Sequence, residues 1–238
     1  MKIIALDSSG LVASVAVASE DTVIAEYTMN YKKTHSQTLL PMLDEISKTI
    51  ELDLNEIDAI AVAAGPGSFT GLRIGSATAK GLGLALNKPI IAVPTVDALS
   101  MNMWGTDRVV CPIMDARRNQ VYTGFYDFDS EGNHRIIREQ FADDIANVCD
   151  ELNKMGRSVV FLGDAVPVYE SVISDKMEID YIYAPMHLSR QRAGALAVLA
   201  YQYYKAGKLE AAAEHSPIYL RLSQAERERA EAQGSVPK

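Results

Sequence analysis

The sequence predicts an α/β protein built from two similar lobes. Apolar runs of strand length alternate with longer stretches in which apolar residues recur every three or four positions, as on one face of a helix. The order of these elements in the first half of the chain recurs, in looser form, in the second half. The 238 residues, 48% of them hydrophobic, are enough for a substantial core in each lobe.

The first half begins with three expected strands, over residues 2–7, 11–18 and 22–29, because polar turn residues separate three apolar runs. The elements expected after them are a helix over 36–50, a strand over 57–64, a helix over 71–86, a strand over 90–93 and a short helix that ends at 101.

The second half repeats this order. Its expected elements are strands over 109–114, 121–128 and 134–139, a helix over 142–155, a strand over 158–162, a helix over 166–174, a strand over 179–183 and a helix over 189–206. Two successive β-β-β-α-β-α units are typical of the duplicated ribonuclease-H-like fold, the architecture of actin, HSP70 and sugar-kinase ATPases.

The expected domain boundaries follow from this duplication. Residues 1–105 form the first lobe, 106–215 the second, and 216–238 a C-terminal segment. The charged stretch from Ser223 to Lys238 is expected to fray.

Charge and cysteine content limit the function classes. The net charge is −8, and residues 1–105 carry 7 basic and 11 acidic side chains, so each half contributes −4. Without a basic run, direct nucleic-acid binding by this chain alone is disfavoured. The two cysteines, Cys111 and Cys149, lack metal-site spacing, and the chain starts with a strand pattern rather than a signal peptide. We expect a soluble cytoplasmic protein.

The most distinctive segment is the glycine-rich loop Ala-Gly-Pro-Gly-Ser-Phe-Thr-Gly-Leu-Arg-Ile-Gly at 64–75, between an expected strand and an expected helix. Such a junction can hold an anion on free N–H groups. However, a P-loop would need Lys and Ser or Thr after Gly71, and the third glycine of a dinucleotide motif is replaced by Thr70. Ser68 also lacks the glycines of a nucleophile elbow.

A nucleotide site between the lobes is the alternative that the fold class suggests. The two turns that would hold phosphates contain Asp7 and Ser9 in the first lobe and Asp115 in the second, and Gly163 lies where an adenosine loop is expected. These four are weak candidates, because Ala116 stands where a glycine is expected. A degenerate ATPase or phosphotransferase that uses Asp7 and Asp115 therefore stays open, but we expect no cofactor.

No catalytic or metal-binding residues are expected. The four histidines have no spacing that places two on one helix face, and no His-Glu-x-x-His motif occurs.

Small residues recur every four positions along the helix after the glycine loop. Gly71, Gly75, Ala79 and Gly83 form this ridge, and interior glycines each cost about 1 kcal/mol relative to alanine. The ridge could pack against the protein's own sheet or form a helix-docking surface, and the sequence leaves both open.

Three motifs resemble the bacterial TsaB (YeaZ) family: the 64–75 loop, Met-Asp-Ala-Arg-Arg-Asn-Gln-Val-Tyr at 114–122 and Pro-Ile-Tyr-Leu-Arg at 217–221. The resemblance implies a non-catalytic paralogue of TsaD, which takes part in forming threonylcarbamoyladenosine next to the anticodon of ANN-decoding tRNAs. TsaD carries a His-x-x-x-His metal pair, and this sequence has Thr95 and Leu99 at those positions. Metal-dependent transfer and metallopeptidase activity are therefore both disfavoured.

The resemblance also implies partners. We expect a heterodimer with TsaD, recruitment of the ATPase TsaE, a homodimer when the chain is alone, and contact with tRNA only through the complex. The expected interface residues lie on the two helices of the first lobe: Leu39, Leu43, Arg73, Gly75, Ala79 and Gly83.

Overall fold

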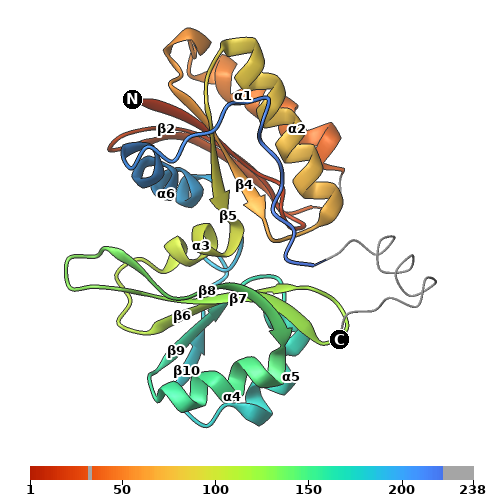
Figure 1. The fold of residues 1–238 in the computed structure, drawn as a ribbon, viewed down its shortest axis with the longest axis vertical. Helices are drawn as coiled ribbons and strands as arrows, with labels where there is room; N and C mark the ends of the chain where they lie inside the picture. Colours follow the sequence, from red (N-terminus) through yellow and green to blue (C-terminus); the bar gives the residue numbers. More distant parts are fainter. Residues whose placement is uncertain (32–33, 222–238) are drawn as a thin grey trace.

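The computed structural model, which describes residues 1–31 and 34–221, contains two five-stranded mixed sheets, one in each lobe (Figure 1). The first sheet has the order β3-β2-β1-β4-β5 and the second the order β10-β9-β6-β7-β8. In both, the first three strands of the lobe pair antiparallel, the fourth pairs parallel with the first, and the fifth pairs parallel with the fourth. The two sheets thus share one topology, which confirms the duplicated ribonuclease-H-like fold.

The strands agree closely with the expected ranges. They are β1 Lys2–Asp7, β2 Ala13–Ser19, β3 Val23–Met29, β4 Ala59–Gly65, β5 Ile90–Pro94, β6 Val109–Asp115, β7 Gln120–Phe128, β8 His134–Asp144, β9 Val159–Leu162 and β10 Tyr181–Tyr183. β1 and β4 are buried along nearly their whole length, because helices cover both faces of the first sheet.

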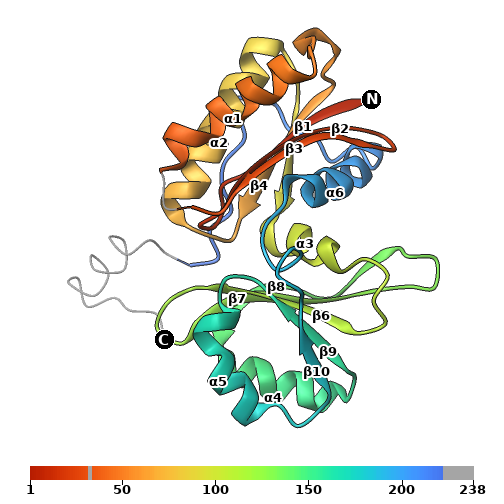
Figure 2. The same cartoon turned by 180° about the vertical axis from the view of Figure 1, so that it is seen from behind.

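One face of the first sheet is covered by α1 His35–Thr49 and α2 Phe69–Leu86, which lie side by side (Figures 1 and 2). The short 3₁₀ turn η1 Leu54–Glu56 precedes β4. From α1, Leu39, Met42, Leu43 and Ile46 enter a core with β1 and β4. The sequence order alone predicts this arrangement, because both helices are crossover connections within one sheet.

The opposite face of the first sheet is covered by α6 Ala193–Lys205, although the sequence places this helix in the second lobe. Its apolar residues, including Leu196 and Ala200, pack with Ile3 and Ala5 of β1. The Tyr201 hydroxyl also donates to the carbonyl oxygens of Met1 and Ala18, at 2.7 and 2.9 Å. In this position α6 buries the apolar face of β1 and β4 that α1 and α2 leave uncovered.

In the second lobe, α4 Ile145–Met155 and α5 Val166–Lys176 cover one face of the sheet. α4 begins at Ile145 rather than at the expected residue 142. The Asp144 carboxylate accepts a hydrogen bond from the Ala146 N–H at 2.9 Å, which caps the helix, and residues 140–144 instead extend β8. No helix in the described part of the chain is long and apolar enough to cross a membrane.

Between the two sheets lies α3 Thr95–Ser100, followed by the 3₁₀ turn η2 Met101–Met103 (Figures 1 and 2). α3 contacts strands of both sheets, so the two lobes share one core. Within this core the Tyr126 hydroxyl of β7 donates to the Asp97 carboxylate of α3 at 2.6 Å. Burial raises the pKa of Asp97 to about 6, despite this hydrogen bond.

Replacing Asp97 by asparagine should change how stability depends on pH. In the unfolded chain the carboxyl loses its proton near pH 4, whereas in the fold it keeps the proton to about pH 6. The folded state therefore binds more protons in this window, and the unaltered protein loses stability as pH rises through it. Asp97→Asn lacks this loss, so its free energy of unfolding relative to the unaltered chain should rise by about 2–3 kcal/mol between pH 4 and pH 7.

Urea unfolding of both proteins at several pH values measures this difference, in which the titration of groups that do not interact with Asp97 cancels. A difference that stays constant from pH 4 to pH 7 would contradict the buried, proton-retaining state of Asp97.

Candidate functional site

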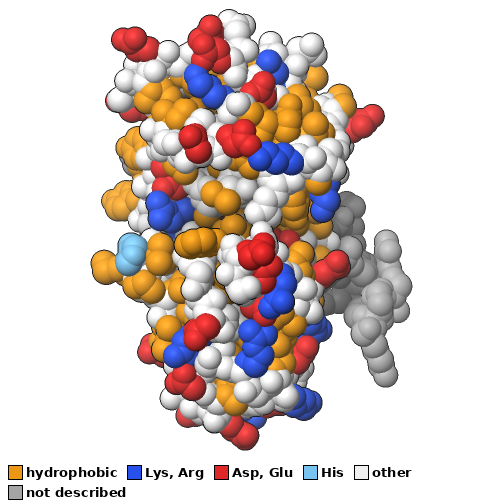
Figure 3. Space-filling model, turned by 90° about the vertical axis from the view of Figure 1, so that its left-hand side faces the viewer, with side chains coloured by type: hydrophobic (Ala, Val, Ile, Leu, Met, Phe, Trp, Pro, Cys, Tyr) orange, Lys and Arg blue, Asp and Glu red, His pale blue; other side chains and the backbone are white. Residues whose placement is uncertain are grey.

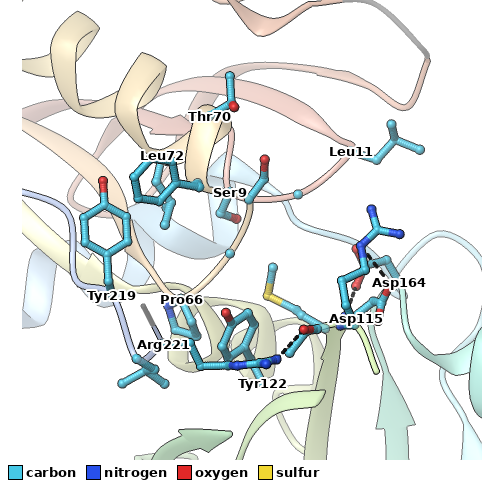
Figure 4. Close-up of a pocket in the computed structure, with 18 of the residues that line it drawn as sticks. Ser9, Leu11, Pro66, Thr70, Leu72, Asp115, Tyr122, Asp164, Tyr219 and Arg221 are labelled. Carbon is cyan, nitrogen blue, oxygen red and sulfur yellow. Dashed lines mark hydrogen bonds and ion pairs between the residues drawn. The ribbon is translucent and has the colours of Figure 1, made fainter. Parts of the chain in front are cut away.

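A cleft of about 740 Å³ lies between the lobes (Figure 4). Four segments line it: the turn after β1, the glycine-rich loop, the turn after β6 and the segment near the described C-terminal end. In Figure 4, Ser9 and Thr70 come from the first lobe, Asp115 and Asp164 face them from the second, and Tyr219 lies along one side.

The wall from the first lobe is built by close packing of its two loops. The Asp7 carboxylate accepts hydrogen bonds from the Ser9 N–H and hydroxyl, at 2.9 and 2.6 Å. A Cβ atom at Gly67 would lie 2.3 Å from the Ser9 carbonyl oxygen, and one at Gly71 would lie 2.0 Å from that of Ser8. These two glycines are therefore required for the approach of the two loops.

The glycine-rich loop also starts α2. The Ser68 hydroxyl accepts a hydrogen bond from the Gly71 N–H at 3.3 Å, and the Ser68 N–H donates to the Ser9 carbonyl oxygen at 2.6 Å. The helix accordingly starts at Phe69, two residues before its expected start. Part of the N–H set that could hold an anion is thus already used within the loop.

The wall from the second lobe centres on Asp115 at the end of β6. Its carboxylate accepts hydrogen bonds from the Arg117 N–H at 2.8 Å and from the Tyr169 hydroxyl at 3.3 Å. The Asp115 N–H donates to the Asp164 carboxylate at 3.2 Å, and burial raises the pKa of Asp164.

The turn that follows Asp115 has an unusual backbone. Arg117, Arg118 and Asn119 have φ values of 67°, 56° and 61°, in the left-handed region that glycine favours. An arginine in this conformation costs about 1–2 kcal/mol of conformational free energy. The turn therefore has a backbone shape that glycine usually provides, although none of these residues is glycine. The Arg117 side chain is 86% exposed.

The structure brings together only two of the four candidate nucleotide-site residues. Ser9 and Asp115 line the cleft, and Asp164 beside them was missed by the sequence analysis although it follows the predicted Gly163 directly. Asp7 is buried behind the turn, where burial raises its pKa to about 6. Gly163 is packed against the Ile113 carbonyl oxygen and is not part of the lining.

The two positions that align with the His-x-x-x-His metal-binding motif carry no histidine. Thr95 and Leu99 are both buried in α3 between the lobes. Among residues 1–31 and 34–221, no three His, Cys, Asp or Glu side chains come close enough to hold a metal ion.

The glycine ridge of α2 faces the protein's own first lobe, which corrects the expected interface. A Cβ atom at Gly75 would lie 2.5 Å from the Ser8 hydroxyl, and one at Gly83 would lie 2.8 Å from Cβ of Ala212. Ala79, Leu39 and Leu43 are likewise buried in the core beneath the two helices. Of the expected interface residues, Arg73 alone is exposed.

A different set of residues, three of them small and one a leucine, points outward from α2. We call Ala77, Gly81, Leu84 and Ala85 the α2 outer face; all four are exposed, and Leu84 is 61% exposed. A Cβ atom at Gly81 would have no neighbour within 4 Å. On α1, Leu40 is also exposed, at 51%. Small residues lie on both faces of α2, so the sequence could not show which face packs against the sheet.

The C-terminal segment 208–221, which we call the strap, runs along the first lobe to the cleft (Figure 1). It begins with a bridge between Glu210 and Ile90 of β5. The Lys80 ammonium of α2 then donates to the carbonyl oxygens of Ala213 and His215, at 2.9 and 3.0 Å. The part of the expected C-terminal segment beyond residue 221, including the stretch expected to fray, lies outside the described residues.

The strap ends beside the glycine-rich loop. The Ile218 N–H donates to the Ala64 carbonyl oxygen at 2.7 Å. The Tyr219 ring lies 4.8 Å from that of Phe69, and its hydroxyl accepts from the Arg73 guanidinium at 3.2 Å. Arg221 then reaches the second lobe, where its guanidinium donates to the Ala116 carbonyl oxygen.

Comparison with known proteins identifies the family. The family model described as TsaD, tRNA N6-adenosine threonylcarbamoyltransferase, matches residues 22–229. The "tRNA threonylcarbamoyladenosine biosynthesis protein TsaB" of Bacillus subtilis is 35% identical over 95% of this chain and 96% of its own length. The TsaB protein of Escherichia coli is 38% identical over 56% of this chain and 58% of its own.

Two solved structures from Pseudomonas aeruginosa agree with this result. One is described as YeaZ, with a TM-score of 0.75 and 26% identity, and covers 92% of this chain and 99% of its own. The other is described as similar to the peptidase YeaZ, with a TM-score of 0.80, 27% identity and the same two coverages. By sequence, extent and fold, the chain belongs to the TsaB (YeaZ) family of tRNA threonylcarbamoyladenosine biosynthesis proteins.

Proposed function

We propose that this chain is a non-catalytic subunit that supports threonylcarbamoyl transfer to tRNA by docking onto TsaD through the α2 outer face. TsaB relatives are biosynthesis proteins for threonylcarbamoyladenosine, and TsaD is the transferase of the matching family model. Because that model matches most of this chain, the two proteins would share a fold and could pair helix to helix. Self-pairing through the same face and recruitment of TsaE belong to the same proposal.

The observation that carries this proposal is Gly81. A glycine inside a helix costs about 1 kcal/mol relative to alanine. A Cβ atom at Gly75 or Gly83 would overlap other atoms of this chain, but one at Gly81 would meet no described atom outside its own helix backbone within 4 Å. A partner helix that approaches closely at Gly81, with the exposed Leu84 three residues further along α2, would account for this glycine.

The non-catalytic role is supported by the cleft. Asp115 and Ser9 both face it, but Asp115 is engaged by Arg117 and Tyr169 and the Ser9 hydroxyl donates to Asp7. The second candidate, a degenerate ATPase or phosphotransferase, is supported only by the size of the cleft and by its carboxylates Asp115 and Asp164. Titration of the purified chain with Mg-ATP separates the two: tight binding with turnover would favour the enzyme.

The first prediction concerns docking. Gly81→Arg places a long charged side chain on the α2 outer face, so the chain should stay folded and lose TsaD from a co-purified complex. Val168→Arg is the matched control, because Val168 is also exposed, at 57%, on α5 of the other lobe. Both variants should melt close to the unaltered chain, since neither position is buried.

Two outcomes of this experiment would contradict the docking prediction. A folded Gly81→Arg chain that still pairs normally with TsaD would place the interface elsewhere. Loss of pairing in both variants would show that added charge, rather than the α2 outer face, is responsible.

The second prediction compares two glycines of the same helix. Gly81→Ala should raise the free energy of unfolding by up to about 1 kcal/mol, because it removes the glycine cost without a clash. Gly75→Ala should lower it by about 1–3 kcal/mol, because its Cβ atom would overlap the Ser8 hydroxyl. Urea unfolding of the single chain measures both, and equal effects would mean that the helix is rotated from the position described.

The third prediction concerns tRNA. Arg190 and Arg192, which could have formed a basic patch, bind the Gly163 carbonyl oxygen and the Glu26 carboxylate of this chain, each at 2.6 Å. On the face shown in Figure 3, basic and acidic side chains are interspersed. The isolated chain should therefore bind tRNA weakly at physiological salt and form no threonylcarbamoyladenosine.

Fluorescence anisotropy with labelled tRNA, at low and physiological salt, measures the affinity. Incubation with tRNA and threonylcarbamoyl adenylate, with and without TsaD, measures the transfer. Submicromolar, salt-sensitive binding or modified tRNA from the chain alone would contradict the proposed role.

A further inference from the structure

We infer that the strap is an interlobe latch: it is fixed along the first lobe, and Arg221 holds the second lobe across the cleft. This latch is a property of the single chain and does not depend on the partner proposed above. It would set the width of the cleft and restrict the motion of one lobe against the other.

The fixed part of the latch is held at several points on the first lobe. The bridge of Glu210 to β5, the Lys80 ammonium and the buried Ala212 hold its first part. His215 is 2% exposed, and the Nδ1 atom of its ring lies 2.7 Å from Oε1 of Glu210. The Ile218 N–H then joins the end of β4 at Ala64. The strap up to Ile218 should therefore move with the first lobe as one body.

The last part of the latch crosses to the second lobe. Tyr219 is held between the lobes by Phe69 and Arg73 of α2, and two residues later Arg221 donates to the Ala116 carbonyl oxygen. Figure 4 shows Arg221 beside Tyr122 of β7, below the first-lobe residues. This crossing is noncovalent, so it can be released without breaking the chain.

The other contacts between the lobes lie around α3, where the two lobes share one core. The chain itself passes between the lobes at residues 101–108 and at 184–192, and Asn102 ties these two passages together by donating to the Leu188 and Arg190 carbonyl oxygens, at 2.9 and 2.7 Å. Both passages therefore lie at one place, beside α3. A single linked region of this kind permits hinge motion, and a contact across the cleft restricts it.

The point that Arg221 holds is itself a constrained turn. The Ala116 carbonyl lies at the start of the left-handed run formed by Arg117, Arg118 and Asn119. A charged donor on a backbone carbonyl is a strong hydrogen bond, worth more than a neutral one. Holding this turn positions the Asp115 wall of the cleft relative to the glycine-rich loop.

The test is a distance between the lobes in the full chain. Spin labels on cysteines introduced at Thr49 of α1 and Val168 of α5, both exposed, report this distance by pulsed electron resonance. The native Cys111 and Cys149 are fully buried and should not be labelled. Arg221→Ala should broaden the distance distribution and shift it to longer values, and Arg221→Lys should restore much of it because lysine keeps a charged donor.

One control separates the latch from other effects. Arg117→Ala removes an exposed side chain from the same turn but leaves Arg221 and the Ala116 carbonyl unchanged, so it should keep the original distribution.

Hydrogen exchange of residues 115–121 in Arg221→Ala, compared with the hairpin turn at 129–133, shows whether the turn is released. Faster exchange at 115–121 with an unchanged interlobe distance would mean that Arg221 only braces its own turn. That outcome, or an unchanged distance with unchanged exchange, would overturn the latch.

Discussion

The contact between the turn after β1 and the start of α2 determines the shape of the first lobe. Carbonyl oxygens of Ser8 and Ser9 lie where side chains at Gly71 and Gly67 would stand. This approach fixes where α2 begins, and the N–H groups of the loop are turned partly toward the protein rather than toward the cleft. The orientation of α2 then decides which small residues are buried and which form the α2 outer face.

Much of the fold could be predicted from the sequence. The apolar runs and polar turns predicted the ends of the strands to within two residues, except for the C-terminal end of β8, and the duplicated order predicted two sheets of one topology. The errors arose where tertiary contacts decide. β8 extends through residue 144 because Asp144 caps α4, and α6 joins the first lobe because β1 needs cover on its second face.

The site was less predictable for the same reason. A repeat of glycine and alanine every four residues shows that a helix has small residues, but not which of its faces meets the sheet. Gly75 and Gly83 pack against Ser8 and Ala212, which are far away in the sequence. From the sequence, only residues 217–221 of the strap could be recognised, as a motif. The role of the strap depends on the contact of Arg221 with Ala116 of the other lobe, which the sequence does not show.

The return of α6 to the first lobe also bears on how the protein is made. The face of β1 formed by Ile3 and Ala5 is synthesised first, but its cover, Leu196 and Ala200, is synthesised near the end. The second lobe lies between them in the chain, and the helices that pack on its sheet, α3, α4 and α5, all precede α6. During translation, the second lobe can therefore form while the first lobe still exposes the apolar face that α6 covers, until the chain has been made as far as Lys205.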